Sequence, residues 1–354
     1  MSSWEPQITR IQKLVKHPNA DALEIATVNN DFPVIVKLGD FKVGDLVSWI
    51  CIDSIVPDNK EFYFLAPVNK ESRTPKYNIG EVPEKYRTIN AKKIRGIFSM
   101  GLIKEKVPHL NEGDSIIEHF GLKKLEEQDE EENIASNIRL RGRNAKSAPK
   151  GWLIPHYDIK SVRKYFYFVE KLTDQEFVIS EKLNGSNFSA CHDGNELWVK
   201  SRNYYKKEDE EDSWWKAANL LNLKEKLIQY PNLAFFGELV GYNSKFRYSV
   251  SIGDDGVVPE VYFFDIYDTK NNKYLDYDEF NSIINKLELK QAPVLHKGFL
   301  PNKEELYKLA EGNSTIGKHL REGFVLKPLK EMWRDEMQSR FILKLVGEGY
   351  SLSK

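Results

Sequence analysis

Cysteine is scarce in this chain: Cys51 and Cys191 are the only two in 354 residues, and they lie far apart in the sequence. Two distant cysteines exclude a disulfide framework and fit a reducing compartment, so we expect an intracellular protein. No run of about 20 consecutive apolar residues is present, which leaves no candidate membrane span. The first residues, MSSWEPQITR, lack the features of a secretory signal.

Excess charge is also lacking, because the formal net charge is only −1. This balance excludes a protein that coats nucleic acid by bulk electrostatics, but it leaves room for a local basic groove. Two acidic runs, EEQDEEE at 126–132 and EDEED at 208–212, hide part of the positive charge and have the pattern of solvated segments. The seven histidines show no zinc-ligand spacing, and no internal repeat is visible.

Apolar residues are plentiful: 41% of the chain is hydrophobic, which is enough to form two hydrophobic cores. The first 120 residues contain short β-branched segments, EIATV, FPVIVKLGD, DLVSWICI and KIRGIFSMGLI, separated by Asn-Asn and Gly-Asp turns. This spacing favours a small barrel of the oligonucleotide-binding (OB) type. We therefore expect an OB-like domain at 1–122, a linker at 123–149 and a second domain at 150–354.

The second domain mixes strands and helices. EFVISEK and ELWVKSRN flank the Asp193-Gly194 dipeptide, which predicts a hairpin with a two-residue loop. LAFFGELVG, VYFFDIYD, REGFVLKPL and FILKLVG predict further strands, and helices are expected at 213–230, near 278–287 and at 302–310. The expected fold class is α+β, with an antiparallel sheet in the second domain.

Six charged residues lie in or beside these apolar strands, where a charge is costly to bury without a partner. They are Lys182, Arg202, Glu238, Asp265, Glu322 and Lys344. Such placements predict a shared charged cavity in which cations attract phosphates and carboxylates hold a divalent metal. Lys182, in ISEKLNGSNFSA, is either a strand-end surface residue or a nucleophile. A lysine attacks phosphorus only as the neutral amine, and lowering its pKa from about 10.4 to about 7 takes roughly 4 kcal/mol.

The order of several motifs along the chain favours the nucleophile over the surface residue as the role of Lys182. EKLNG, SRN, FFGELVG, FFDIYD, EGFVLK and FILKLV resemble motifs I, Ia, III, IIIa, IV and V of the covalent nucleotidyltransferase superfamily, which includes DNA ligases, RNA ligases and mRNA capping enzymes. DNA ligases and capping enzymes carry an OB domain after motif V, whereas only ten residues follow Lys344 here. HPNADALEIATV, GDFKVGDLV, KIRGIFSMGLI and IPHYDIKSVRKY instead resemble an ATP-dependent RNA ligase family with an N-terminal OB domain.

That resemblance implies a ligase that joins 3′-OH and 5′-phosphate RNA ends, preferring breaks in duplexes, with ATP as substrate and Mg²⁺ or Mn²⁺ as cofactor. Lys182 would form a lysyl-AMP, and Lys344 would contact the α-phosphate. Glu322 would bind the metal, and Glu238 would bind the ribose or join the metal shell. The implied ATP-binding residues are Glu181, Lys182, Asn184, Arg202, Glu238, Phe264, Lys327 and Lys344. Arg202 with Asn203 would contact the ribose or the RNA end, and Phe264 or Phe236 would stack on adenine.

Two positions depart from the usual motifs. Asn184 stands where the widespread form of motif I has aspartate, and Val346 stands where motif V often has a second lysine. The second departure leaves fewer positive charges around the triphosphate. Lys327 or a basic residue of the first domain is expected to compensate.

Alternatives remain at this stage. A DNA ligase or a GTP-dependent capping enzyme would share the chemistry, and a non-catalytic RNA-binding protein would share the fold. The OB-like domain would bind RNA, with Lys92, Lys93 and Arg95 on the backbone, or orient pyrophosphate, or serve structure alone. The sequence leaves open the physiological RNA, the tolerance of DNA, the preferred metal and the subunit number.

Overall fold

The computed structural model describes residues 4–125, 145–146, 155, 157, 159–202, 204–241, 248, 252–253 and 256–353. Most of the expected linker at 123–149, the basic segment at 139–150 and Asn203 lie outside these residues. The described residues divide into two compact units. The first unit takes those within Met1–Glu127, Lys160–Lys171 and Ser351–Lys354, and the second takes those within Gln128–Ile159 and Leu172–Tyr350.

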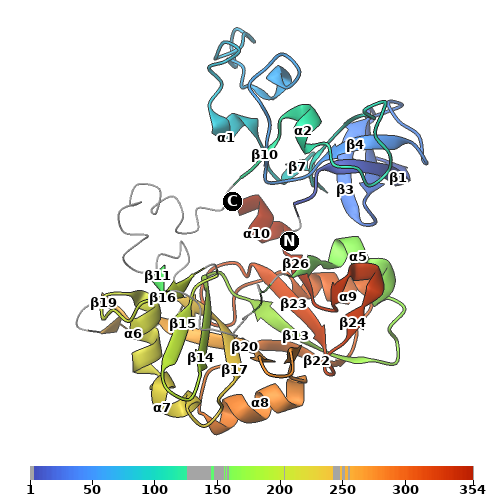
Figure 1. The fold of residues 1–354 in the computed structure, drawn as a ribbon. Helices are drawn as coiled ribbons and strands as arrows, with labels where there is room; N and C mark the ends of the chain where they lie inside the picture. The colour runs from blue at the N-terminus through green and yellow to red at the C-terminus, as the bar shows by residue number, and fades with distance from the viewer. Residues whose placement is uncertain are drawn as a thin grey trace. The chain divides into compact units, whose positions relative to one another are not determined.

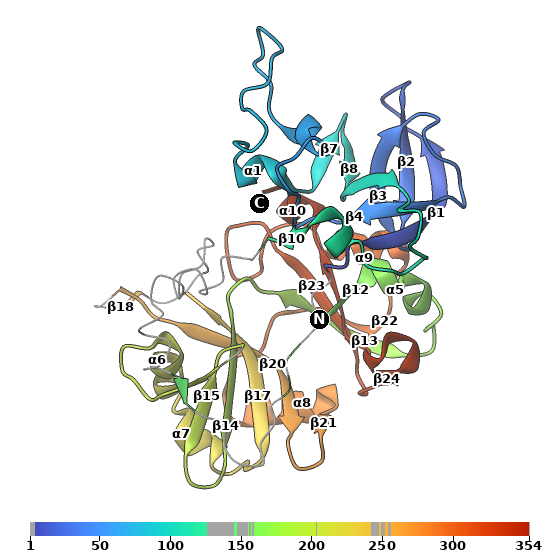
Figure 2. The same cartoon turned by 45° about the horizontal axis from the view of Figure 1, so that its top comes forward.

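The first unit is built on a five-stranded antiparallel sheet in the order β3-β2-β1-β4-β9, drawn in blue and cyan in Figures 1 and 2. The strands are β1 (Gln7–Lys16), β2 (Leu23–Val28), β3 (Phe32–Lys37), β4 (Leu46–Ile50) and β9 (Leu102–Glu105). Asn29 and Asn30 connect β2 to β3 with φ of 45° and 77°, a conformation that asparagine tolerates well. Around Trp49, which is 1% exposed, Ile11, Val34 and Phe98 form the core of this sheet.

Shorter elements complete the first unit. They are β5 (Ser54–Ile55), η1 (Tyr63–Leu65), α1 (Glu84–Arg87), β6 (Thr88–Ile89), β7 (Lys92–Ile94), β8 (Ile97–Ser99), α2 (Ile117–Phe120) and β10 (Lys123–Lys124). β7 and β8 form a hairpin whose turn contains Arg95 and Gly96. Lys92, Lys93 and Arg95 are all exposed, so three cations lie together on one hairpin.

Helix α5 (Val162–Val169) packs within the first unit although it follows the linker in sequence. Ser161 caps it, because its side chain accepts a hydrogen bond from the backbone N–H of Arg163. Arg163 is buried and donates to the carbonyl of Asp31 at 3.3 Å, and Lys164 pairs with Glu5. Residues 160–171 are therefore tied to the barrel strands by charge.

The second unit contains a seven-stranded antiparallel sheet in the order β11-β16-β15-β14-β17-β20-β21. The strands are β11 (Ala145–Lys146), β14 (Ser186–His192), β15 (Leu197–Lys200), β16 (Tyr205–Lys206), β17 (Leu233–Val240), β20 (Glu260–Asp268) and β21 (Lys273–Tyr274). The β14–β15 hairpin forms where Asp193-Gly194 predicts one. Its loop has four residues, not two, because Asp193 accepts hydrogen bonds from the backbone of Asn195 and Glu196.

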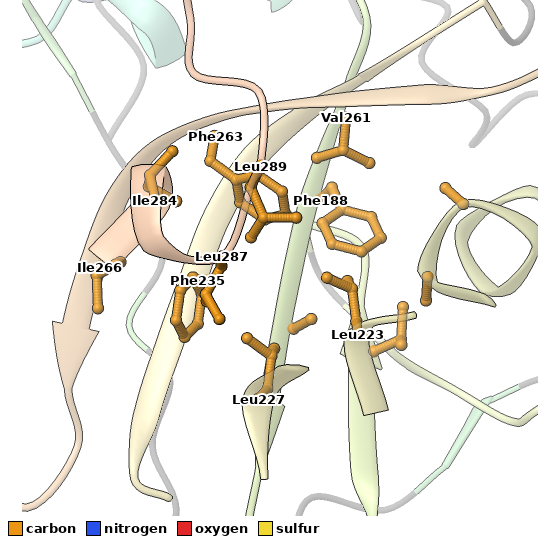
Figure 3. Packing of buried hydrophobic residues seen from close by; sticks show 14 of the residues in the cluster. Phe188, Leu223, Leu227, Phe235, Val261, Phe263, Ile266, Ile284, Leu287 and Leu289 are labelled. Carbon is orange, nitrogen blue, oxygen red and sulfur yellow. The ribbon is translucent and has the colours of Figure 1, made fainter. Parts of the chain in front are cut away.

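Three helices cover one face of this sheet: α6 (Ser213–Leu220), α7 (Leu223–Leu227) and α8 (Tyr277–Lys286). Figure 3 shows the packing beneath them, with Phe188, Phe235 and Phe263 of three neighbouring strands meeting leucines of α7. The expected single helix at 213–230 is wrong, since Asn222 adopts a left-handed conformation with φ of 51° and divides it in two. Asp212 caps α6 by accepting from the backbone of Trp214 and Trp215.

A second sheet in this unit contains β26, β23, β13 and β22, in that order, all antiparallel. The bounds are β13 (Glu176–Lys182), β22 (Val294–Phe299), β23 (Gly323–Pro328) and β26 (Leu343–Val346). The other elements of this unit are β18 (Ile252–Gly253), β19 (Gly256–Val257), α9 (Lys303–Leu309), β24 (Trp333–Arg334), η2 (Asp335–Met337) and β25 (Ser339–Arg340). β12 (Lys160–Ser161) belongs to the first unit, and α10 (Glu348–Ser353) begins in the second. The chain passes from β13 into β14 through Leu183, Asn184 and Gly185, so this short loop joins the two sheets.

Both cysteines are buried free thiols. None of the helices in the described part of the chain has the length and apolarity that crossing a membrane requires.

Candidate active site

Lys182 is the last residue of β13, a strand hydrogen-bonded on both sides. Phe177, Val178 and Ile179 are each at most 1% exposed, which fixes the strand firmly. The side chain of Lys182 is 21% exposed, so its amine can be reached by a ligand. Because β13 is rigid and buried, it holds the Lys182 side chain at its end in a defined position.

Glu322 is the direct partner of this lysine. Its Oε1 lies 2.7 Å from Lys182 Nζ, and its side chain is only 10% exposed. The next residue, Gly323, allows β23 and β26 to lie close together: its φ is +153°, and a Cβ there would lie 1.9 Å from the carbonyl oxygen of Leu345. Glu-Gly in EGFVLK therefore has a physical reason, because any larger residue at 323 would force β23 and β26 apart.

Glu238 of β17 reaches the same loop from the other sheet. Its Oε1 accepts a hydrogen bond of 3.0 Å from the backbone N–H of Gly185. A Cβ at Gly185 would lie 2.2 Å from the carbonyl oxygen of Leu239, so the loop and β17 touch at a point that admits only glycine. Glycine three residues after Lys182 thus lets the loop pack directly against the strand that carries Glu238.

Asn184 is held by two tyrosines that are distant in sequence. Its backbone N–H donates to the hydroxyl of Tyr248 at 2.6 Å, and its side-chain Nδ2 donates to the hydroxyl of Tyr350. Burial raises the pKa of Tyr248 above its ordinary value, and the negative charges of Glu322, Glu238 and Glu181 raise it further. The three carboxylates therefore all lie near the Tyr248 hydroxyl. The expected site residues around Lys182 thus lie near one another.

Glu181 faces away from Lys182, as successive residues of a strand do. Its carboxylate is 3% exposed and accepts two hydrogen bonds from Thr315, from the backbone N–H at 2.8 Å and the hydroxyl at 2.6 Å. The guanidinium Nε of Arg321 lies 3.8 Å away. The side chain of Glu181 thus fixes the segment around Thr315, and its backbone is what remains near the nucleophile.

Lys344 lies on the same sheet face as Lys182. It pairs with Val325, which pairs with Ser180, and directly opposed residues of antiparallel strands share a face. Ser180 and Lys182 are two residues apart and share that face too. The structure therefore brings together four expected site residues, Lys182, Glu322, Glu238 and Asn184, and places Lys344 on the same sheet face as Lys182.

Lys327 also shares this face, through its pairing with Val178, but its ammonium is already bound. It is 6% exposed and donates at 3.0 Å both to Asp265 Oδ1 and to the carbonyl of Phe264. These bonds use two of the three donors of the ammonium, so a phosphate contact through the third would not displace either of them. That Lys327 compensates for Val346 stays a prediction.

Asp265 is the centre of a buried charged network. It is 0% exposed, it accepts a 2.7 Å hydrogen bond from Tyr157, and its Oδ2 lies 2.8 Å from Nη1 of Arg340. Burial alone would raise the pKa of this carboxyl, but Arg340 and Lys327 outweigh burial and hold it below its ordinary value. Asp265 is therefore an ionised structural anchor that joins β20, β23 and β25.

Phe264 occupies a β-bulge. Phe236 pairs with Asp265 while the next residue, Gly237, pairs with Phe263, so Phe264 is the extra residue of β20. Its ring lies 4.8 Å from that of Tyr157, centroid to centroid. Phe236, the other expected stacking residue, is 1% exposed within the sheet and belongs to the core.

Arg202 is exposed and follows β15. Its carbonyl accepts a 2.8 Å hydrogen bond from Nζ of Lys200, which is buried at 6% exposure opposite Ser189 and Tyr205. Burial lowers the pKa of Lys200 from 10.5 to about 8. The structure thus positions the Arg202 backbone with a buried lysine, and Asn203, beside it, lies outside the described residues.

We expect Lys200 to make the protein more stable as the pH rises through 8 to 10.5. The folded pKa is below the unfolded one, so the unfolded state binds more protons in this window and the free energy of unfolding increases with pH. The full shift corresponds to about 3 kcal/mol. Urea midpoints of the wild type and Lys200→Met at pH 7.5 and 10.5 test this, because groups common to both cancel in the difference. Identical pH profiles would contradict it.

The sequence analysis did not single out Tyr248, Tyr350, Thr315 or Arg340. Each acts through a contact with a residue far away in the chain, and tyrosine and threonine give no local signal for such a role. The C-terminal segment GEGYS carries Tyr350 directly after motif V, and its two glycines are the only hint of close packing there.

A metal would find two suitable carboxylates here. Across the part of the chain that the structure describes, no three His, Cys, Asp or Glu side chains are grouped to hold a metal. Mg²⁺ and similar ions, however, are commonly held by one or two carboxylates together with water and substrate phosphates. Glu322 and Glu238, which flank the Lys182–Gly185 loop, fit that pattern.

A lysine paired with a glutamate at the end of a buried antiparallel strand, with a second glutamate across the loop, places one amine and two carboxylates around one short loop. A family model for RNA ligase matches residues 175–346, and a model for an OB-fold domain matches residues 6–105. Residues 175–346 are therefore similar to the RNA ligase family, and residues 6–105 to an OB-fold domain. The comparison with curated proteins gave no match.

Solved structures of the Naegleria gruberi RNA ligase resemble the whole chain. A mutant without ligand is 23% identical with a TM-score of 0.78, covering 99% of this chain and 98% of that one. A mutant with ATP and Mn is 22% identical with a TM-score of 0.76, covering 98% and 97%, and the ligase with PPi is 23% identical with a TM-score of 0.75, covering 98% and 97%. At this identity the likeness establishes the fold, and it confirms the α+β class with an N-terminal OB-fold domain.

Proposed function

We propose that this protein is an ATP-dependent RNA ligase that joins 3′-OH and 5′-phosphate RNA ends, at nicks in duplexes, through a lysyl-AMP intermediate. The observation that carries the proposal is the Lys182–Glu322 pair at 2.7 Å, within a domain that matches the RNA ligase family. The Naegleria relatives solved with ATP and Mn, with AMP and Mn and with PPi support the choice of nucleotide and metal.

The first step of the proposed reaction uses Lys182 as the nucleophile. The neutral amine forms a bond to the α-phosphorus of ATP, the bond from that phosphorus to the bridging oxygen of pyrophosphate breaks, and pyrophosphate leaves with the electron pair. The nitrogen loses one proton to solvent when the ammonium becomes the neutral amine and a second to solvent once the P–N bond has formed. Lys344, on the same sheet face, is suited to stabilise the charge on the α-phosphate during transfer.

Glu322 and Glu238 have two tasks in this step. Before ATP binds, Glu322 neutralises the Lys182 charge, and Glu238 holds the loop through Gly185. A divalent cation bound to these carboxylates and to the phosphates would disfavour the ammonium form of the lysine and neutralise phosphate charge. Because both carboxylates lie in one small region, binding the nucleotide and preparing the nucleophile are coupled.

The second and third steps transfer and release AMP. A 5′-phosphate oxygen of RNA attacks the phosphorus of lysyl-AMP and displaces Lys182, giving RNA with an adenylylated 5′ end. The 3′-OH then attacks the RNA 5′-phosphorus, a phosphodiester bond forms, and AMP leaves. Arg202, exposed beside β15, is the residue proposed to contact the RNA end, and Phe264 is proposed to stack on adenine.

Labelling with three nucleotides tests the proposal and separates it from its rivals. The protein is incubated with α-³²P-ATP, α-³²P-GTP or labelled NAD and Mg²⁺ or Mn²⁺, then run on a denaturing gel, with EDTA as the metal-free control. We expect label from ATP alone, and none with EDTA. Label from GTP would favour a capping enzyme, and no label from any nucleotide would favour a non-catalytic RNA-binding protein.

Sealing assays define the substrate. A nicked RNA duplex with a 5′-phosphate should be sealed, and the same duplex with a 5′-OH should not. A nicked DNA duplex of the same sequence serves as the matched comparison, and preferential sealing of DNA would contradict the RNA assignment.

A further inference from the structure

Gly347 and the first three residues of α10, Glu348, Gly349 and Tyr350, form a short segment beside the candidate active site that we call the strap. The backbone N–H of Gly347 donates to the carbonyl of Glu322 at 2.9 Å. At the other end, the Tyr350 hydroxyl accepts a hydrogen bond from the side chain of Asn184. The strap therefore touches both the residue that pairs with Lys182 and the loop that follows Lys182.

The strap is itself fixed between these two contacts. The carboxylate of Glu311 accepts a 2.6 Å hydrogen bond from the backbone of Glu348 and a 3.2 Å hydrogen bond from that of Gly349. A Cβ at Gly347 would lie 2.6 Å from the carbonyl oxygen of Ala310, so the strap packs directly on the end of α9. Tyr350 is 4% exposed. A buried tyrosine on an anchored backbone can hold its hydroxyl in one place.

Asn184 receives this constraint in addition to two others. Tyr248 holds its backbone, and Glu238 holds the backbone of the next residue, Gly185. These two contacts fix the loop's main chain, whereas the Tyr350 contact fixes the only polar side chain between Lys182 and Gly185. Because residue 184 is an asparagine, the loop adds no negative charge beside the Lys182 amine. The neutral hydroxyl of Tyr350 is a suitable hydrogen-bond partner for the Asn184 side-chain amide.

We infer that Tyr350 is a positioning residue for the nucleophile, acting through Asn184, and that the strap Gly347–Tyr350 sets the geometry in which Lys182 meets the nucleotide. This inference rests on the proposed function. It concerns the first chemical step, because that is the step in which Lys182 must be aligned with a phosphorus. An oxygen of the RNA itself is the nucleophile in the final sealing step, so sealing of RNA that is already adenylylated depends on this alignment less.

The test uses the full chain with Tyr350→Phe, which removes the hydroxyl and keeps the buried ring. Tyr267→Phe is the matched control, because Tyr267 is also buried and its hydroxyl donates to Asn272 on the same chain. We measure the rate of label transfer from α-³²P-ATP at saturating ATP, the ATP concentration at half-maximal rate, and Tm. For Tyr350→Phe we expect a rate about 10-fold lower, a half-maximal concentration within 2-fold of wild type and an almost unchanged Tm; one lost hydrogen bond to a reacting loop is of this order.

A double-mutant cycle shows whether the effect passes through Asn184. If Tyr350 acts through this side chain, Asn184→Ala slows labelling, and adding Tyr350→Phe slows it no further. Asn184→Asp, whose carboxylate can accept a hydrogen bond from the tyrosine hydroxyl, should again lose rate when Tyr350→Phe is added. Independent, multiplicative losses in the cycle would overturn the inference.

A pre-adenylylated RNA substrate distinguishes a positioning role of Tyr350 from a general loss of activity. Sealing of a pre-adenylylated nicked RNA by Tyr350→Phe should stay within about 3-fold of wild type, since a hydrogen bond that acts only on the lysine step leaves this step alone. An equal loss in both assays, or wild-type labelling by Tyr350→Phe, would refute the positioning role while leaving the ligase assignment intact. If the wild type takes no label from ATP, the proposed function and this inference fail together.

Discussion

Lys182→Ala should abolish covalent labelling by ATP, with a rate at least about 1,000-fold below that of the wild type, because removing a nucleophile removes the step itself. Lys182→Arg should be equally inactive, since a guanidinium stays protonated and cannot attack phosphorus. The change should leave the fold intact, because Lys182 is the last residue of β13 and the backbone pairing of that strand does not depend on its side chain. Gel detection of ³²P after denaturation is the measurement.

Lys297→Ala is the control for that experiment. Lys297 lies on β22, which pairs with β13, and it makes an exposed ion pair with Asp278 at 3.1 Å. Its replacement should leave labelling within about 2-fold of wild type, because exposed ion pairs contribute little. Both Lys182 variants should still seal a pre-adenylylated nicked RNA, because that step needs no lysine nucleophile. Residual labelling of Lys182→Ala above background would locate the nucleophile elsewhere.

Asp265→Ala is expected to have the largest effect on stability, a loss of about 3–5 kcal/mol in the free energy of unfolding. The substitution leaves the ammonium of Lys327 and the guanidinium of Arg340 buried without the carboxylate they share. It also removes the acceptor of the Tyr157 hydroxyl. Urea unfolding at pH 7.5 measures the loss.

Asp268→Ala, three residues later on the same strand, serves as its comparison. Asp268 accepts hydrogen bonds from the backbone of Lys270 and Asn271 in a partly exposed turn, and no salt bridge from it is found among the described residues. Its loss should cost about 1 kcal/mol. Equal destabilisation by the two variants would mean that the buried network is not what makes Asp265 important.

Much of the fold could be predicted because it is encoded locally. Apolar strands such as EFVISEK and LAFFGELVG are buried on both faces, and turn residues mark their ends. β1 was not predicted although it is the longest strand, because a bulge between Ile11 and Lys13 interrupts its alternation. The helix at 213–230 was predicted as one element because the left-handed Asn222 has no signature that distinguishes it from an ordinary helical asparagine.

The candidate site, too, could be predicted from the sequence only in part. Lys182, Glu238 and Glu322 stand out because they are charged residues in or beside apolar strands, and the structure gathers them around one loop. Lys327 carries the same signal, yet its charge serves Asp265, since sequence shows that a buried cation needs a partner but not which partner it has. Tyr248 and Tyr350 could not be predicted, because their role depends on contacts 64 and 166 residues away along the chain.

The bulge at Phe264 has a consequence for how this strand tolerates insertions and deletions. With Phe264 present, Phe263 faces the helix-covered core while Asp265 opposes Phe236 on the other face. Removing Phe264 would restore simple alternation and leave both neighbours facing as they do now. Removing Phe263 or Asp265 would restore alternation too, but the Phe264 ring would then take the place of the core phenylalanine or of the buried carboxylate. Phe264 is thus the residue of this bulge whose deletion keeps both the core and the Asp265 network.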